Sequence, residues 1–167
     1  SAEIYLLHPE FGLRVAAMRS LMRAKKYDVI LPLLRSDDPR LRHCGIIGIT
    51  GMFKGPSLPQ SELTREMVRE LMKMIDDPDE SWWVVRGAMA ALSRAGNRVI
   101  AKNKDRLIEL AESESRWIRD QAVRTLSEIA LEPRYLREVL PVVTHGAANA
   151  DVGWGLAYQV FSDLSKR

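Results

Sequence analysis

The chain is poor in the residues that carry most metal and covalent chemistry. It has one cysteine, Cys44, and three histidines, His8, His43 and His145, which are far apart along its 167 residues. A single cysteine excludes an internal disulfide framework and a cysteine-based zinc cluster. None of the histidines belongs to an HExxH pattern or stands beside an acidic residue. We therefore expect no catalytic residues, no metal site and no cofactor, in a protein that is not an enzyme.

Long apolar runs are also absent. No run approaches the roughly 20 residues needed to cross a bilayer, so we expect no membrane segment. A composition of 46% hydrophobic and 28% charged residues is typical of a globular protein of about one domain. The chain opens without an initiator methionine and shows no targeting signal. We expect a fragment of a larger protein, and its compartment stays open, with the cytoplasm as the default.

A strong, evenly spread positive charge is missing as well. The formal net charge is +3, and residues 1–56 hold nine Lys or Arg against five Asp or Glu. Residues 57–112 hold nine against ten, and residues 113–167 hold seven against seven. A protein that tracks DNA is expected to spread its positive charge along one continuous face. Nucleic acid therefore stays an alternative partner that this distribution disfavours.

A nine-residue pattern recurs along the chain and predicts the fold. Each copy has an apolar residue at its first position, a small residue four positions later and a second apolar residue four positions after that. This spacing places the three side chains on one face of a helix. The small residue, such as Gly45, lets a neighbouring helix approach closely. Four clear copies and one degenerate copy occupy 13–21, 41–49, 84–92, 118–126 and 152–160. Gly146, Gly153 and Gly155 suggest that the last repeat is loose.

Shorter apolar segments between these copies are predicted as partner helices. They occupy 29–34, 67–75, 106–111 and 136–143. The turns 37–39 and 76–78 each contain Asp-Asp-Pro, which favours an Asp N-cap with the proline as first helical residue. A serine of the turn 112–115 is the expected cap of a further helix, and 55–61 is the one long loop. The sequence therefore predicts an all-α fold with an opening helix and four helix pairs.

In several motifs the chain resembles the HEAT-repeat family, including its HEAT-like and lyase-type branches. These motifs are Pro32 and Pro141 near the start of first helices, an Asp in the turn, and an apolar-Arg pair that opens second helices. The resemblance implies a right-handed α-solenoid of about four HEAT-like helix pairs plus an opening helix, as a single domain over residues 1–167. It also implies a polar ladder between neighbouring repeats, formed by Asp38, Arg42, Asp77, Arg86 and Arg119.

Tryptophans and arginines are the best candidates for partner binding. Alignment of the copies on their last apolar residue places Arg40, Trp83 and Trp117 in one column. Stacked helices lie roughly 10 Å apart, so this column predicts a strip along the second-helix N-termini. Trp82, Arg116 and Trp154 would flank the strip. Aromatic residues and Arg dominate binding hot spots and also stack on unpaired bases, although simple packing against the turn is an alternative.

Three functions fit these features, and the first needs no additional chemistry. It is a non-catalytic scaffold that binds an unidentified protein or peptide on the concave solenoid face, with self-association through the solenoid ends as a further option. The alternative is a HEAT-like glycosylase for alkylated DNA bases, suggested by Trp83, Trp117, Asp120 and the basic first third. A lyase-type protein that cradles a tetrapyrrole is the least favoured.

Overall fold

The computed structural model describes residues 2–52, 62–149, 160–162 and 165–166. Throughout these residues the regular structure is helical and no β-strand occurs, which confirms the all-α prediction. The loop at 55–61, Trp154 and nearly all of the copy at 152–160 lie outside the described residues. Contacts divide the chain into two compact units, unit 1 (Ser1–Ala95) and unit 2 (Gly96–Arg167). Each unit is described by itself, and the single domain stays a prediction.

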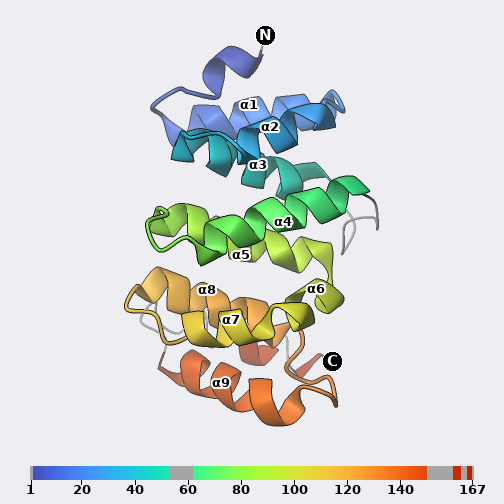
Figure 1. Ribbon diagram of the computed structural model, residues 1–167, viewed down its shortest axis with the longest axis vertical. Coiled ribbons are helices and arrows are strands. Elements are labelled where there is room, and N and C mark those ends of the chain that lie inside the picture. The colour runs from blue at the N-terminus through green and yellow to red at the C-terminus, as the bar shows by residue number, and fades with distance from the viewer. Residues whose placement is uncertain (1, 53–61, 150–159, 163–164, 167) are drawn as a thin grey trace. The chain divides into compact units, whose positions relative to one another are not determined.

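Unit 1 contains the first two predicted helix pairs. Its elements are η1 (Ala2–Tyr5), α1 (Phe11–Arg23), η2 (Tyr27–Val29), α2 (Ile30–Leu34), α3 (Pro39–Met52), α4 (Glu62–Asp76) and α5 (Trp82–Ala95). Helix α2 packs on α3, and α4 packs on α5 (Figure 1). Helix α3 also contacts both α1 and α5, while α2 contacts α4. Equivalent helices of successive pairs are therefore in contact within this unit.

Small residues on α3 allow this close packing, as the repeated pattern predicts. A Cβ added at Gly45 would lie 2.8 Å from Cδ2 of Leu34 and 3.0 Å from the Leu34 backbone nitrogen, so α2 approaches α3 closely. A Cβ at Gly48 would lie 2.8 Å from Cε of Met18 on α1. Leu34 and Met18 are fully buried. Tight contacts of this kind leave no room for an added methyl group.

The turns of unit 1 follow the prediction at one place and depart from it at the other. Pro39 is the first residue of α3, and the Oδ1 atom of Asp38 accepts the Arg40 N–H at 2.8 Å. Pro78, in contrast, lies inside the turn, because α5 begins only at Trp82. The Asp77 carboxylate accepts the N–H of Asp79 at 2.9 Å, an Asx-type turn that delays the helix. The prediction that Pro78 opens the helix is therefore wrong.

Unit 2 is built around one central helix. Its elements are α6 (Asn97–Lys102), α7 (Lys104–Leu110), α8 (Arg116–Ser127) and α9 (Leu136–Ala148). Helix α8 packs against both α7 and α9. Ala122, Leu126 and Ile129 are fully buried, as the apolar stripe of the copy at 118–126 predicts. Helix α6 was not predicted from the sequence; it follows Gly96, whose backbone lies in the left-handed region at φ 97°.

One expectation about α9 is wrong, and another lies mostly outside the described residues. Pro141 lies in the second turn of α9, not in the first, because the helix starts only at Leu136, after a turn closed on the Glu132 carbonyl. Gly153 and Gly155 lie outside the described residues, so the loose last repeat stays a prediction, and only Gly146 can be described. It faces Val123 of α8 so closely that a Cβ at this position would clash with the valine side chain. The glycine therefore permits the contact between α8 and α9.

Candidate functional site

Three arginines make the same contact at the start of three helices. Arg14, Arg42 and Arg119 are each the fourth residue of their helix, α1, α3 and α8. Each donates from Nη1 to the carbonyl oxygen six residues earlier, at 2.7, 2.8 and 2.8 Å respectively. The apolar-Arg motif thus fastens a helix N-terminus to the turn that precedes it. We call this contact the arginine clamp.

The clamp of Arg42 has a second partner, from the following helix pair. Its Nε and Nη2 atoms donate to the two carboxylate oxygens of Glu80 at 2.7 and 2.8 Å. The Glu80 side chain is only 3% exposed, and it also accepts the N–H of Ser81 at 2.8 Å. This bidentate ion pair ties α3 to the turn before α5. The acceptor is Glu80 and not one of the aspartates expected in the ladder.

Three of the other expected ladder residues, Asp38, Asp77 and Arg119, make contacts within their own turns. Asp38 forms an ion pair with Arg40 at 2.7 Å, and the hydrogen bonds from Arg40 lower the pKa of Asp38 to about 2. Asp77 accepts the N–H of Asp79, as described above. Arg119 donates to the carbonyls of Ser113 and Glu114 in its own turn. Arg86 is exposed on α5, where Val85 occupies the fourth position.

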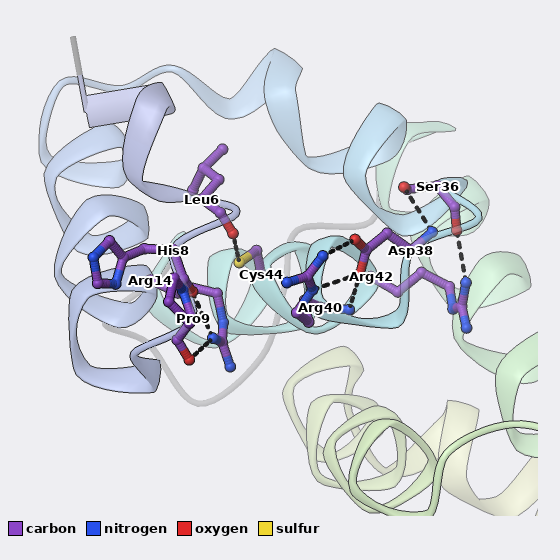
Figure 2. A network of polar contacts seen from close by, with 9 residues as sticks. All are labelled: Leu6, His8, Pro9, Arg14, Ser36, Asp38, Arg40, Arg42 and Cys44. Atoms are coloured by element: carbon purple, nitrogen blue, oxygen red, sulfur yellow. Dashed lines mark hydrogen bonds and ion pairs between the residues drawn. The ribbon is translucent and has the colours of Figure 1, made fainter.

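The clamp of Arg14 lacks the carboxylate that Arg42 has. Arg14 is 8% exposed, and its Nη1 atom donates to the carbonyls of His8 and Pro9, both at 2.7 Å (Figure 2). Its Nε atom is buried and has no hydrogen-bond partner. Among the described residues, no carboxylate forms an ion pair with this guanidinium. An unpaired buried cation is costly unless something neutralises it.

An aromatic row, formed by Phe11, His43 and Trp83, lies beside this clamp. The ring centroids of Phe11 and His43 are 5.6 Å apart, and those of His43 and Trp83 are 5.2 Å apart in a T-shaped arrangement at 86°. The three side chains come from the N-terminal parts of α1, α3 and α5. Phe11 is 53% exposed, while His43 and Trp83 are half-buried. The row therefore crosses three helices, of which α1 contacts α3 and α3 contacts α5.

Electrostatics link the row to Arg14. The guanidinium carbon of Arg14 lies 5.7 Å from the Phe11 ring centroid. Burial lowers the pKa of His43, and the positive charge of Arg14 lowers it further. Gly87 of α5 leaves space for the imidazole, because a Cβ there would lie 3.4 Å from Cδ2 of His43. Phe11, Arg14, His43 and Trp83 thus form one site, in which His43 is held neutral next to a cation.

The predicted strip residues are placed as follows. Trp83 contacts His43, whereas Arg40 is exposed and paired with Asp38. Trp82 is 44% exposed at the first position of α5. In unit 2, the guanidinium carbon of Arg116 lies 4.8 Å above the Trp117 ring. Trp83 and Trp117 belong to different units and Trp154 lies outside the described residues, so the full strip stays a prediction.

Sequence reasoning missed Phe11, His43 and Arg14 as members of a site. A signal for His43 was available, because it follows Arg40 by three residues and thus lies near the predicted column on the helix surface. Phe11 stands one residue before Gly12, which occupies the column in the first copy. Nothing in the sequence indicates that Arg14 lacks a carboxylate partner, because ion pairing depends on how helices far apart in sequence pack.

Other chemistry in the described residues is sparse. They contain no group of three or more His, Cys, Asp or Glu side chains suited to a metal ion. Cys44 is fully buried, its thiol lies 3.6 Å from the Leu6 carbonyl oxygen, and burial raises its pKa. A buried, protonated thiol is a poor nucleophile. None of the helices described is both long and apolar enough to span a membrane.

Comparison of the chain with protein-family models, with curated proteins and with solved structures finds no match in any of the three. The geometry of the site is therefore the basis on which a function can be proposed.

Proposed function

We propose that this chain is a non-catalytic scaffold of the HEAT-repeat type, a right-handed α-solenoid that binds a protein or peptide segment. The packing in unit 1 supports this architecture, because α3 contacts α1 and α5 while α2 contacts α4. Such contacts are expected where successive helix pairs stack with a regular translation. The Arg42–Glu80 ion pair supports it further, since it joins one pair to the next.

The aromatic row carries the functional part of the proposal. Phe11, His43 and Trp83 form a continuous line across three helices, and Phe11 is an exposed residue. Aromatic side chains are enriched in binding hot spots because they bury a large, rigid surface with little loss of side-chain entropy. An extended segment that follows the helix N-termini would contact the three rings in turn.

The alternative of a DNA-binding glycosylase gains no support from the charges. Much of the basic excess in the first third is paired with carboxylates of the protein itself. The pairs are Lys26 with Glu3, Arg35 with Glu66 and Glu70, Arg40 with Asp38, and Arg42 with Glu80. Cations already paired in this way contribute less to phosphate binding than free ones. A peptide or protein partner therefore remains the proposal.

Selection from a random peptide library on the full chain tests the proposal. We expect enriched peptides whose affinity falls at least about tenfold, or about 1.4 kcal/mol, in Trp83→Ala and Phe11→Ala. Trp82→Ala is the matched control, because Trp82 is the neighbouring tryptophan and lies outside the row. Helicity measured by circular dichroism should be unchanged in all three variants.

Two results would count against the proposal. One is a library selection without enrichment, and the other is peptide binding that Trp83→Ala and Phe11→Ala leave unchanged. A duplex-DNA titration at several salt concentrations forms a separate arm. Tight, strongly salt-dependent binding in that arm would favour the glycosylase-type alternative.

A further inference from the structure

The two clamps on α1 and α3 differ in one pair of donor atoms. In Arg42, the Nε and Nη2 atoms are both occupied by the carboxylate of Glu80. In Arg14, Nη1 makes the same carbonyl contact, but Nε has no partner and Nη2 makes no hydrogen bond to a described residue. The Nε–Nη2 edge of a guanidinium matches a carboxylate in a bidentate geometry. Arg14 therefore has the same donor edge as Arg42 without an acceptor among the described residues. Because its Nε atom is buried, the carboxylate of a partner reaches Nη2 first, and a bidentate contact requires that Nε be uncovered on binding.

The nearby acidic residues of unit 1 do not supply that acceptor. Asp37 stands two residues before α3, as Glu80 stands two residues before α5, but Asp37 is exposed and forms no ion pair with Arg14. Glu10, the residue just before α1, likewise makes no ion pair with Arg14. Asp38 is engaged with Arg40. The clamp of α1 thus keeps a net positive charge.

The surroundings of Arg14 indicate what kind of group would neutralise it. The Phe11 ring lies over the guanidinium, and the His43 and Trp83 rings continue the line. The chain already contains a ligand of this composition, because Glu80 is followed by Ser81, Trp82 and Trp83. The Glu80 carboxylate binds Arg42, and Trp83 packs on His43. Arg42 and His43 both lie on α3. A glutamate followed closely by an aromatic residue is therefore the composition that this fold recognises internally.

We propose that the Nε–Nη2 edge of Arg14 binds a glutamate side chain of the partner segment, whose neighbouring aromatic residue packs on the aromatic row. The inference rests on the proposed function and specifies its ligand. The bound carboxylate supplies the counter-ion that Glu80 supplies to Arg42. Because the guanidinium is already fixed by the His8 and Pro9 carbonyls, little side-chain entropy is lost on binding.

The test uses two tetrapeptide probes that differ in one group. The first, acetyl-Glu-Ser-Trp-Trp-amide, copies residues 80–83, and the second replaces the glutamate by glutamine. Each is titrated into the full-length, ¹⁵N-labelled chain while the Arg14 Nε–H resonance is followed. We expect saturable shifts with the glutamate probe and at least about tenfold weaker binding of the glutamine probe. The pKa of His43 should be higher with the glutamate probe bound, because the carboxylate offsets the charge of Arg14.

Two variants separate a specific site from general charge attraction. Arg14→Met keeps a long apolar side chain and should abolish the preference for glutamate over glutamine. Arg19→Met removes an exposed cation from the same helix and should leave the preference intact. If Arg14→Met unfolds, Arg14→Lys retains the charge without the bidentate edge and should reduce the preference strongly.

Failure of this inference can be told apart from failure of the proposed function. Equal affinities for the two probes, or no saturable shift at the Arg14 resonance, would overturn the carboxylate site even if library peptides still depend on Phe11 and Trp83. A glutamate preference that depends on Arg14 but survives Trp83→Ala and Phe11→Ala would instead sustain the carboxylate contact and remove the aromatic row from the account.

Discussion

The N-terminal ends of α1 and α3 are built alike and surrounded differently. Both place an arginine at the fourth position and bind it to the carbonyl six residues earlier. On α3 the arginine also binds a buried glutamate of the next helix pair, whereas on α1 the same edge has no acceptor among the described residues. The comparison suggests that one local motif serves two purposes. With an internal carboxylate it joins helix pairs, and without one we propose that it binds a carboxylate of a partner.

The largest expected effect is on stability at the α3 clamp. Arg42→Ala should lower the free energy of unfolding by about 3–5 kcal/mol, because it leaves the buried Glu80 carboxylate without its counter-ion. Urea unfolding followed by circular dichroism measures this loss. Arg40→Ala is the control, since its ion pair with Asp38 is solvent-exposed and should matter little. Equal effects of the two substitutions would contradict the structural role of the α3 clamp.

A second difference between the helices concerns their glycines. Gly45→Ala should destabilise the chain by about 1–3 kcal/mol, because the new methyl group would meet the Leu34 backbone and side chain. Gly12→Ala should be neutral or stabilising by up to about 1 kcal/mol, because no atom lies within 4 Å of the added Cβ and alanine favours the helix. Thermal unfolding of the two variants gives the comparison. Destabilisation by Gly12→Ala would show that this face of α1 is covered.

Removal of the α1 arginine should cost much less than removal of its α3 counterpart. Arg14→Met loses two hydrogen bonds to carbonyls but leaves no carboxylate unpaired, so the expected loss is about 1 kcal/mol. The same urea experiment measures it. A loss as large as that of Arg42→Ala would mean that Arg14 has a structural counter-ion after all, and the comparison between the clamps would fail.

The smallest expected effect is a pH dependence that arises at His43. Burial and Arg14 lower its pKa below the usual 6.5, so the unfolded chain binds the proton more readily than the folded chain. The contribution of this pKa difference to the free energy of unfolding is fully present above about pH 6.5, the pKa in the unfolded chain. It is lost as the pH falls through the lower pKa of His43 in the folded chain. His43→Gln should flatten this part of the profile between pH 7.5 and 5.5. An unchanged slope in the variant would contradict a depressed pKa.

The sequence predicts the helices better than it predicts the site. The recurring apolar-small-apolar pattern locates α1, α3, α5 and α8, because burial on one helix face is a local property of the sequence. It misses α6, which has only six residues and no repeated stripe. Pro78 is misplaced because the Asx-type turn at Asp77 competes with a helix start.

The site depends on how the helices pack, and this sets the limit of sequence reasoning. The contact between His43 and Trp83 joins residues 40 positions apart and requires a particular register between α3 and α5. The Arg42–Glu80 pair likewise depends on where the turn before α5 lies. The tryptophan column made Trp83 a candidate, and its binding role stays a prediction, but its neighbours in space differ from its neighbours in the alignment.

The most direct test of the account is the footprint of a selected peptide on the ¹⁵N-labelled chain. Amide resonances should shift mainly in the first turns of α1, α3 and α5, with the side-chain signals of Trp83 and Arg14 among the largest changes. Shifts confined to α8, α9 or the outer surface of α4 would contradict a binding site at the aromatic row.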